Sequence, residues 1–438
     1  MKITFINHAS FLLKSKSATL ICDPWTQGKA FNDGWALLSP SAKVPYDRVD
    51  FIWVSHEHPD HFSFATLKAI PAVDRQRITV LYQKHSSPRL VDAFHKLGFT
   101  NVRELPLYHW VSLRPGFDVL CGSVGAMDSF LAIRTETECI LNINDCVCNE
   151  PQLKYIQKLV GNVSLLFTQF SFANWIGNHA DEIHAVSDKL SEFTLQRSIF
   201  QPEFTIPFAS FVYFCNQENA WMNDFMVTSA HIAAMNLPGV NFMYTGDVWD
   251  SLARSFDSNR AVARFMSDLE NKHIDPTPPS VDEDKIREAI LKLFAALRDK
   301  FGKTILRRMK PFEIYAHDIN RIFAVSPLEI RCEIRAPAPA EAARARYVMC
   351  SQVAWYTFAH TWGWATLEVS GMYLDRGFNA KNPDLLLNRT INALSTDLLN
   401  FSSPARTVRT LGFFWGKKYE LMYRFLASGS PMATAGAQ

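Results

Sequence analysis

The segment FIWVSHEHPDHF, residues 51–62, holds the pattern that decides the fold. It opens with an unbroken apolar run that ends at Ser55, which is typical of a strand buried on both faces. The residues that follow offer four potential metal ligands: His56, His58, Asp60 and His61. Imidazole nitrogens and carboxylate oxygens are donors that zinc, iron and manganese take in proteins. We therefore expect a metal site in the loop after a buried strand.

The spacing of these ligands predicts two metal ions rather than one. His56 and His58 stand two residues apart, so both side chains can point at one centre. Asp60 and His61 can turn toward a second centre nearby. The alternative is an exposed polar turn rich in histidine, but three imidazoles and a carboxylate so close together argue against it.

A further candidate ligand, Asp145, follows the apolar segment ILNIN at residues 140–144. An ionised carboxylate directly after a buried strand needs a cation nearby, because burying an uncompensated charge is costly. The alternative is a simple turn aspartate, which would have the same place in the sequence.

The composition is that of an ordinary globular protein large enough for two domains. The chain has 438 residues, 20% of them charged, and a formal net charge of +2. No basic tract suits a phosphate backbone, and no apolar run approaches the ~20 residues that cross a bilayer, so we expect neither nucleic acid nor a membrane as partner. The eight cysteines are scattered, and the start of the chain shows no secretory pattern. We expect a cytoplasmic protein with reduced thiols.

Strand-like and helix-like segments alternate in the first half, which predicts sheets covered by helices. The expected strands are residues 3–13, 18–22, 51–55, 78–81, 118–120, 130–134, 139–143, 163–167, 198–201 and, as the last clear one, 240–244. The expected helices are residues 63–69, 88–97, 180–195 and 286–297. We expect a metal-binding catalytic domain at residues 1–250 and a smaller helical and mixed region at 251–438, with a disordered tail. That second region could close over the metal site or form an oligomer interface.

The motif H-x-H-x-D-H, present as His56, His58, Asp60 and His61, resembles the signature of the metallo-β-lactamase superfamily. The resemblance implies an α/β (α+β) fold, a four-layer αβ/βα sandwich with the metals at the loop ends of two sheets and a smaller α+β region appended. It makes Asp145 the acid that bridges the two metals. The superfamily's earlier aspartate is matched by Asp23 in LICDPW. The resemblance also places His8 in FINHASFLL beside the metal ligands rather than among them.

Four segments resemble the CMP-N-acetylneuraminate hydroxylase branch of this superfamily, and the opening strand resembles its lactonase-like branch. In order along the chain the four are SHEHPDHFSFATLKAI (55–70), AMDSFLAI (126–133), ILNINDC (140–146) and PFASFVYF (207–214). The similarity covers about residues 1–250. It implies that an oxygen-using, iron-dependent reaction is possible alongside hydrolysis.

Two departures from the superfamily pattern concern histidine ligands. Val124 stands where the first metal's third histidine is expected, and Asn216 stands in the position of the last one. A histidine of GNHADEIH, His179 or His184, could replace a lost ligand. The chain also has no C-x-H plus C-x-x-H pair for an iron–sulfur centre, so electrons would come from an external donor or from the substrate.

The remaining donors indicate iron. His56 and His58 with one carboxylate form the two-histidine, one-carboxylate arrangement of non-haem iron oxygenases. Asp128 could add a carboxylate ligand, and its alternative is a hydrogen-bonded loop aspartate. We expect two metal ions, with iron favoured and zinc or manganese as the alternative.

Three functions remain open on the sequence alone. The favoured one is a diiron oxidoreductase, a monooxygenase, acting on a small polar metabolite. The second is a metal-dependent hydrolase of lactonase or phosphodiesterase type, with Asp60 or Asp145 as the catalytic residue that orients a metal-bound hydroxide. The third is a binding protein without activity.

Overall fold

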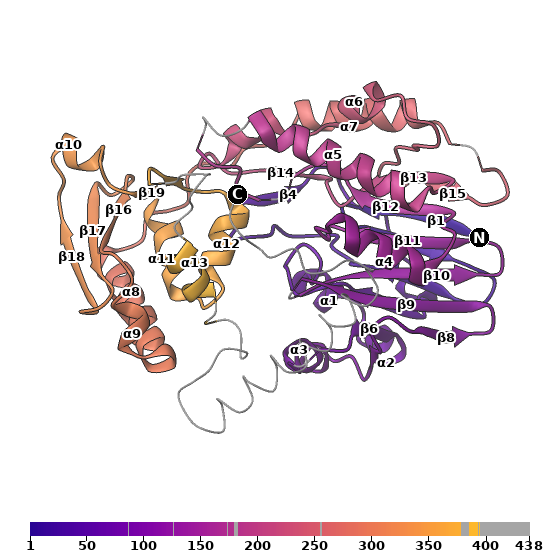
Figure 1. Ribbon diagram of the computed structural model, residues 1–438, viewed down its shortest axis with the longest axis horizontal. Coiled ribbons are helices and arrows are strands. Elements are labelled where there is room, and N and C mark those ends of the chain that lie inside the picture. The colour runs from indigo at the N-terminus through magenta and orange to yellow at the C-terminus, as the bar shows by residue number, and fades with distance from the viewer. Residues whose placement is uncertain are drawn as a thin grey trace.

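Two β-sheets of the N-terminal region face each other across a shared apolar core (Figure 1). The computed structural model describes residues 1–85, 87–125, 127–172, 174–178, 183–254, 256–377, 385–392 and 394. The first sheet has the order β15 (Val248–Asp250), β1 (Lys2–Asn7), β2 (Ser10–Lys14), β3 (Thr19–Cys22), β5 (Phe51–Val54), β6 (Thr79–Gln83) and β7 (Asn101–Leu105). The second has the order β13 (Phe204–Phe208), β12 (Leu165–Gln169), β11 (Cys139–Asn144), β10 (Asp128–Thr135), β9 (Phe117–Val124) and β8 (Trp110–Arg114). A small sheet pairs β14 (Val212–Phe214) with β4 (Trp35–Leu37).

Strand β5 shows why the strands inside this layered fold are apolar on both faces. Phe51 and Trp53 point into the core between the two sheets, whereas Ile52 and Val54 pack in a separate core on the outer face. Successive side chains of a strand point to opposite faces, so a strand inside a layered fold needs apolar residues at every position.

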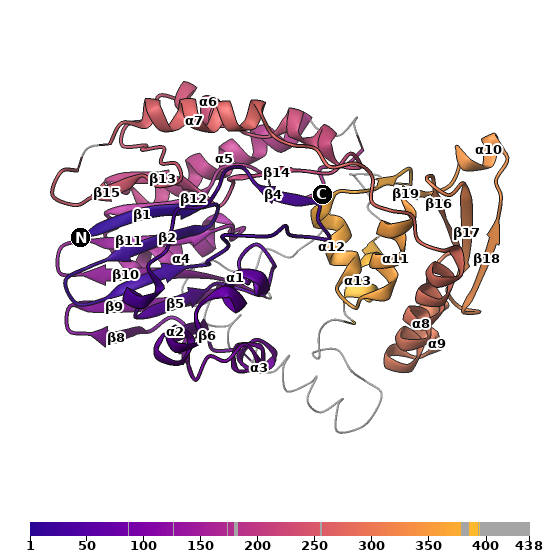
Figure 2. The same ribbon diagram turned by 180° about the vertical axis from the view of Figure 1, so that it is seen from behind.

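Helices cover the outer face of each sheet. Figure 2 shows α1 (Phe64–Ala69), α2 (Ala72–Arg77) and α3 (Arg89–Lys96) near the first sheet. Apolar side chains of α1 and α3 pack against the outer face of that sheet. The second sheet is covered by α4 (Glu150–Val160) and by the end of α5 (Ile183–Phe200). The layers run helix, sheet, sheet, helix, which confirms the predicted four-layer αβ/βα sandwich.

Helix α7 (Ser258–Glu270) extends the first core beyond the predicted division at residue 250. Its residues Ala261, Phe265 and Leu269 pack in the core between the two sheets, and α6 (Ser229–Ala234) contributes Ile232 to the same core. The apolar core of the N-terminal region therefore includes residues as far along the chain as the end of α7.

The C-terminal region has a core and a sheet of its own and lies beside the N-terminal sheets in both views (Figures 1 and 2). Its sheet has the order β18 (Arg331–Arg335), β17 (Arg321–Ser326), β16 (Phe312–Ala316), β19 (Tyr347–Met349) and β20 (Leu374–Asp375). Its helices are α8 (Glu283–Phe301), α9 (Lys303–Leu306), α10 (Pro339–Ala342), α11 (Ser351–Ala359), α12 (Gly363–Ser370) and α13 (Leu385–Asn392). This mixed architecture agrees with the appended α+β region expected from the sequence.

Several sequence-based expectations need correction. The strand expected at 3–13 is two strands, because the chain reverses at His8 with a positive φ of 34°. Residues 198–200 end α5 instead of forming a strand, since the apolar residues there continue the helix. Residues 240–244 contain one isolated bridge, from Val240 to Thr205, and β15 follows them as the edge strand. The tail expected to be disordered lies outside the described residues.

Within the described ranges, the helices are all too short or too polar to cross a membrane. All eight cysteines are free thiols.

Phe265 tests the place of α7 in the first core. It is fully buried and contacts the rings of Phe170, Phe211 and Phe242. Phe265→Ala should lower the free energy of unfolding by about 3–5 kcal/mol, because the truncation loses apolar burial and leaves a cavity. Denaturant unfolding followed by tryptophan fluorescence measures this loss. Arg260→Ala, at an exposed position of the same helix, is the control, and equal midpoints for the two variants would contradict the assignment.

An ion pair across the two regions gives their contact a pH dependence. The His317 ring after β16 lies 2.8 Å from Glu218 of the N-terminal region. The hydrogen bond to Glu218 raises the pKa of His317 above its ordinary value. The stabilisation is therefore complete below the unfolded-state pKa of about 6.5 and is lost as the pH rises through the raised pKa.

His317→Gln should consequently lower the thermal unfolding midpoint more at pH 5.5 than at pH 8.5. His273→Gln, whose side chain is largely exposed, is the matched control. A midpoint difference that grows with pH would have the wrong sign for this ion pair.

Candidate metal centre

The predicted ligands meet at the carboxyl ends of parallel strands from both sheets. Strands β3, β5 and β6 run parallel in the first sheet, and β11, β12 and β13 run parallel in the second. The loop after β5 carries the histidine motif, and Asp145 follows β11. Open α/β sheets bind ligands at this edge, because the loops that follow several parallel strands converge there.

His56 and His58 form one half of the cluster. His56 Nε2 lies 2.8 Å from His58 Nδ1, so the two ring nitrogens face each other. Asp145 Oδ2 and Asp128 Oδ1 lie 3.6 and 4.0 Å from the same His56 nitrogen. His56, His58 and Asp128 can together offer three donor atoms to one ion.

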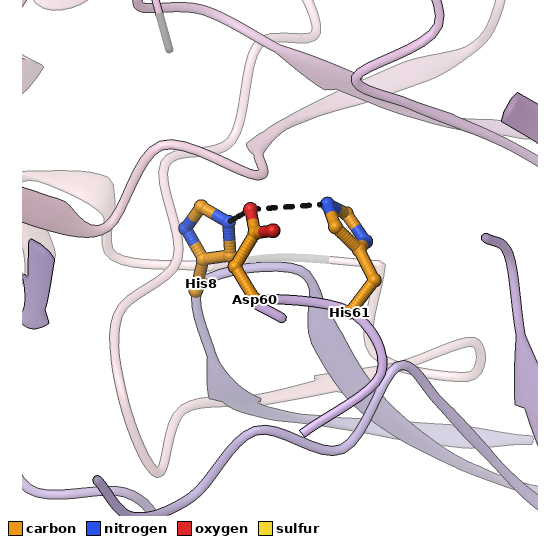
Figure 3. A group of neighbouring side chains, drawn as sticks. All are labelled: His8, Asp60 and His61. Carbon is orange, nitrogen blue, oxygen red and sulfur yellow. Dashed lines mark hydrogen bonds and ion pairs between the residues drawn. The ribbon is translucent and has the colours of Figure 1, made fainter. Parts of the chain in front are cut away.

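Asp60 and His61 form the other half. His61 Nε2 lies 3.3 Å from Asp60 Oδ2 and 3.3 Å from Asp145 Oδ2 (Figure 3 shows the Asp60 contact). Asp145 therefore approaches both halves, as a carboxylate shared by two ions would. His8, Asp60 and His61 form a further group of potential ligands, as do His56, His61 and Asp145.

A buried network around Asp23 holds the His61 ring in place. Asp23 accepts hydrogen bonds from the Ser55 backbone N–H at 2.7 Å and from the Ser55 hydroxyl at 2.8 Å. It also accepts one from His61 Nδ1 at 2.9 Å and one from Asn144 Nδ2 at 2.5 Å. A carboxylate that binds Nδ1 of a histidine fixes its tautomer and leaves Nε2 for the metal. Asp23 is therefore placed to orient the His61 ring toward the cluster.

Three residues of the site have left-handed backbones. His8, Asp23 and Asn144 have φ values of 34°, 36° and 61°. Each ends or directly follows a strand, where the positive φ turns the side chain into the cluster. Such conformations are unfavourable for side chains other than glycine, and they persist where the surrounding structure holds them.

The pKa values show how strongly these buried groups depend on one another. Burial alone would raise the pKa of Asp60 and of Asp145, but the charge of His61 brings both below their usual value. Burial alone would lower the pKa of His61, but Asp145, Asp60 and Asp23 raise it well above its usual range. His61 therefore carries a proton that balances carboxylates, and a metal ion can replace that proton.

In the first half of the cluster the pKa shifts have the opposite directions. Burial and the neighbouring imidazoles lower the pKa of His56 and of His58. Burial and the charge of Asp145 raise the pKa of Asp128 to about 6. Neutral imidazoles are the form that binds metals, and the carboxylates that repel each other here need a cation between them.

Atoms without hydrogen-bond partners show that the cluster fits metal ions. Asp60 Oδ1, His61 Nε2 and Asp145 Oδ1 are buried and have no hydrogen-bond partner among the described residues. Buried polar atoms are normally paired, so these three lack something that binds both oxygen and nitrogen lone pairs. A first-row metal ion satisfies that requirement.

A cavity of about 690 Å³ opens onto the cluster. His58, Asp60, Asp128 and Asp145 lie in its wall. The remaining wall is mainly aromatic and polar, and includes Phe31, Trp35, Gln169, Phe172, Trp175, Lys189 and Glu192. Val369 of α12 lines it too, so the C-terminal region contributes to the wall, one of the two roles that the sequence left open.

Neither residue at the positions of the missing histidines contributes a donor atom to the cluster. Val124 packs in the outer core beneath α4, because it shares the outward face of β9 with Leu120. The Asn216 side chain bonds instead to the Pro276 carbonyl and the Glu218 backbone N–H. His179 lies outside the described residues, as does the side chain of His184.

Sequence reasoning missed two residues of the Asp23 network, Ser55 and Asn144. Asn144 shares the inward face of β11 with Ile140, which is a detectable signal for a polar residue at the end of a buried strand. Ser55 directly precedes the motif, and the sequence alone indicates only that the strand ends there.

Comparison with known proteins shows what the N-terminal region is similar to. Residues 2–123, which include the histidine motif, match the family model of the beta-lactamase superfamily domain. A putative Rieske 2Fe-2S iron-sulfur protein of Mycolicibacterium smegmatis is 29% identical over 189 residues, 40% of this chain and 35% of the relative. The cytidine monophosphate-N-acetylneuraminic acid hydroxylase of Danio rerio is 31% identical over 153 residues, 33% of this chain and 25% of the relative. The chain thus spans about a third or less of these relatives' lengths.

The solved structures to which this chain is similar include two with different described activities. CmlA, a diiron β-hydroxylase from Streptomyces venezuelae, has a TM-score of 0.38 and 16% identity, with 57% of this chain and 53% of that one covered. A possible metal-dependent hydrolase from Veillonella parvula has a TM-score of 0.42 and 15% identity, with 57% and 98% covered.

The Asp23 network predicts how metal affinity responds to a change behind the ligands. Asp23→Asn removes the charge that binds His61 Nδ1 but keeps an acceptor oxygen, so the metal affinity should fall about 10–100-fold. Chelator competition with the purified variant measures this change. Asp47→Asn, at an exposed position, is the control and should leave the affinity unchanged. An Asp23→Asn protein with wild-type affinity would contradict the role of Asp23.

Proposed function

We propose that the protein is an enzyme that uses two metal ions, with iron favoured, to hydroxylate a small polar metabolite with dioxygen. The observation that carries this proposal is the oxygen-rich donor set beside the cavity. His56 Nε2 lies 3.6 Å from Asp145 Oδ2 and 4.0 Å from Asp128 Oδ1, and His58 can offer a donor atom to the same ion as His56 and Asp128. Two histidines with a carboxylate and open positions are the arrangement of non-haem iron(II) oxygenases.

In such a reaction one oxygen atom of dioxygen enters a bond of the substrate and the other leaves as water. The balance requires two electrons and two protons, which we assign to a reduced electron-transfer protein as external donor. Iron held by the cluster would supply the oxygen-activating, one-electron chemistry that amino-acid side chains lack. Because all eight cysteines are free, we expect the reaction to occur in the cytoplasm, where thiols stay reduced.

The chain's own residues bind and orient the substrate. Phe31, Trp35 and Phe172 give the cavity an apolar wall that excludes water from one side of the ligands. On another side Lys189, almost fully buried, donates to Glu192 at 2.8 Å and offers charged hydrogens to polar groups of the substrate. A mixed wall of this kind suits a small molecule with both a hydrophobic face and polar substituents.

Hydrolysis is the second candidate, and the same half-cluster supports it. His56, His58 and Asp128 are three protein donors, the number that catalytic zinc sites use while they keep one position open. In that case Asp60 or Asp145 would accept a proton from the attacking water. Zinc or manganese would then support turnover of an ester, lactone or phosphodiester without dioxygen.

Metal content and oxygen consumption separate the candidates. Protein purified without air should contain about two iron ions per chain by plasma mass spectrometry, and should consume dioxygen once it is reduced. Zinc or manganese alone, in cells grown with sufficient iron, would favour hydrolysis. A protein with no stoichiometric metal would contradict both and favour a binding protein without activity.

His58→Ala should remove metal and activity together. The substitution deletes one of the two imidazoles of the first half-cluster, so at least one metal per chain should be lost and turnover should fall by two orders of magnitude or more. The same mass spectrometry and oxygen assay measure both effects. His273→Ala is the control, and full metal retention by His58→Ala would exclude His58 as a ligand.

A further inference from the structure

His8 has a more prominent place in the cluster than the sequence suggests. It sits in the tight reversal between β1 and β2, and only 2% of its surface is exposed. Its backbone N–H donates to Asn7 Oδ1 at 2.9 Å, and its carbonyl accepts from the Ala209 N–H at 3.0 Å. The backbone is therefore fixed on both sides, and the ring has one defined direction.

That direction is toward the carboxylate of Asp60. His8 Nε2 lies 3.3 Å from Asp60 Oδ2, and His61 Nε2 lies 3.3 Å from the same oxygen. In Figure 3 the two rings approach Asp60 from either side, each with a nitrogen turned to it. The two rings are 5.9 Å apart, centroid to centroid.

These distances match donors that share an ion better than they match direct ion pairs. A charged hydrogen bond from a nitrogen to a carboxylate is usually about 2.7–2.9 Å long. Two donors that are each about 2.1 Å from a tetrahedral metal ion lie about 3.4 Å apart. The contacts of Asp60 with His8 and with His61, and that of His61 with Asp145, are all 3.3 Å.

The electrostatics of this half of the cluster leave room for a cation. Asp60 Oδ1, Asp145 Oδ1 and His61 Nε2 are buried without hydrogen-bond partners among the described residues. His61 Nε2 lies 3.3 Å from a carboxylate oxygen of each aspartate without a hydrogen bond, as a donor to a shared ion would. An ion bound to those two carboxylates would lie within reach of His8 as well, because the donor atoms of His8, Asp60 and His61 are all within 4.8 Å of one another.

We propose that His8 Nε2 is a ligand of the second metal ion, together with Asp60, His61 and Asp145. This inference rests on the two-metal centre proposed above and changes the role of His8 from a neighbour of the ligands to one of them. The competing explanation is that His8 only orients Asp60 by a hydrogen bond.

Two substitutions of His8 separate these explanations. His8→Gln keeps an N–H donor for Asp60 but removes the imidazole, so it retains an orienting hydrogen bond and loses the ligand. His8→Gly removes both, and glycine accepts the positive φ of 34° without strain, so any loss of metal cannot come from the backbone. His273→Gln, at a largely exposed position, is the matched control.

The experiment titrates iron(II) or cobalt(II) into metal-free protein and counts ions bound per chain with their dissociation constants. Both His8 variants should keep the first ion, and the affinity for the second should fall more than about 100-fold, beyond what loss of an orienting neighbour costs. The visible absorption of the cobalt(II)-loaded variants should change accordingly, because the second ion loses a nitrogen donor.

Three results would overturn the proposal. If the affinity for the second ion falls less than about 100-fold in the His8→Gln variant, His8 orients Asp60 and does not bind metal. Unchanged binding in His8→Gly would exclude both roles. A wild-type chain that binds only one ion would overturn the two-metal centre itself, whereas two ions in the wild type with intact His8 variants would overturn the role of His8 alone.

Discussion

Four carboxylates, Asp23, Asp60, Asp128 and Asp145, converge at one edge of two packed sheets, and their mutual repulsion is the constraint on which the site depends. In a buried environment this charge is tolerated only with compensating cations and hydrogen bonds. Asp23 is balanced by four hydrogen bonds. Asp60 and Asp145 each keep a buried oxygen without a hydrogen-bond partner among the described residues, which is why metal ions are the natural complement of this cluster.

The pairing of the strands within each sheet brings the four carboxylates to the same edge. Strands buried on both faces hold their carboxyl ends rigidly, and the tight turns at His8, Asp23 and Asn144 direct polar side chains inward. The C-terminal region completes the cavity above the cluster through Val369. The wall of the cavity therefore includes residues of both regions, which also contact each other through the pair of His317 and Glu218.

The parts of the fold and site that follow from local sequence were predictable, whereas those that depend on packing across the sheets were not. The apolar run before His56 predicts a buried strand, and the motif that follows predicts the ligand cluster. The partners of Asp23 could not be derived, because Asn144 reaches it from the opposite sheet. Residue 124 was a misleading place to look for a ligand, since alternation along β9 turns Val124 outward. The division expected at residue 250 separates α7 from the first core that its apolar residues join, because local sequence does not say which core a helix packs in.

The central claim is that this cluster binds two metal ions, and anomalous X-ray diffraction tests it most directly. Crystals of protein purified without air would be measured on both sides of the iron and zinc absorption edges. The account predicts two anomalous peaks, one between His56 and His58 and the other between Asp60 and His61, with Asp145 adjacent to both. A single peak, or none in protein that keeps the fold, would contradict it.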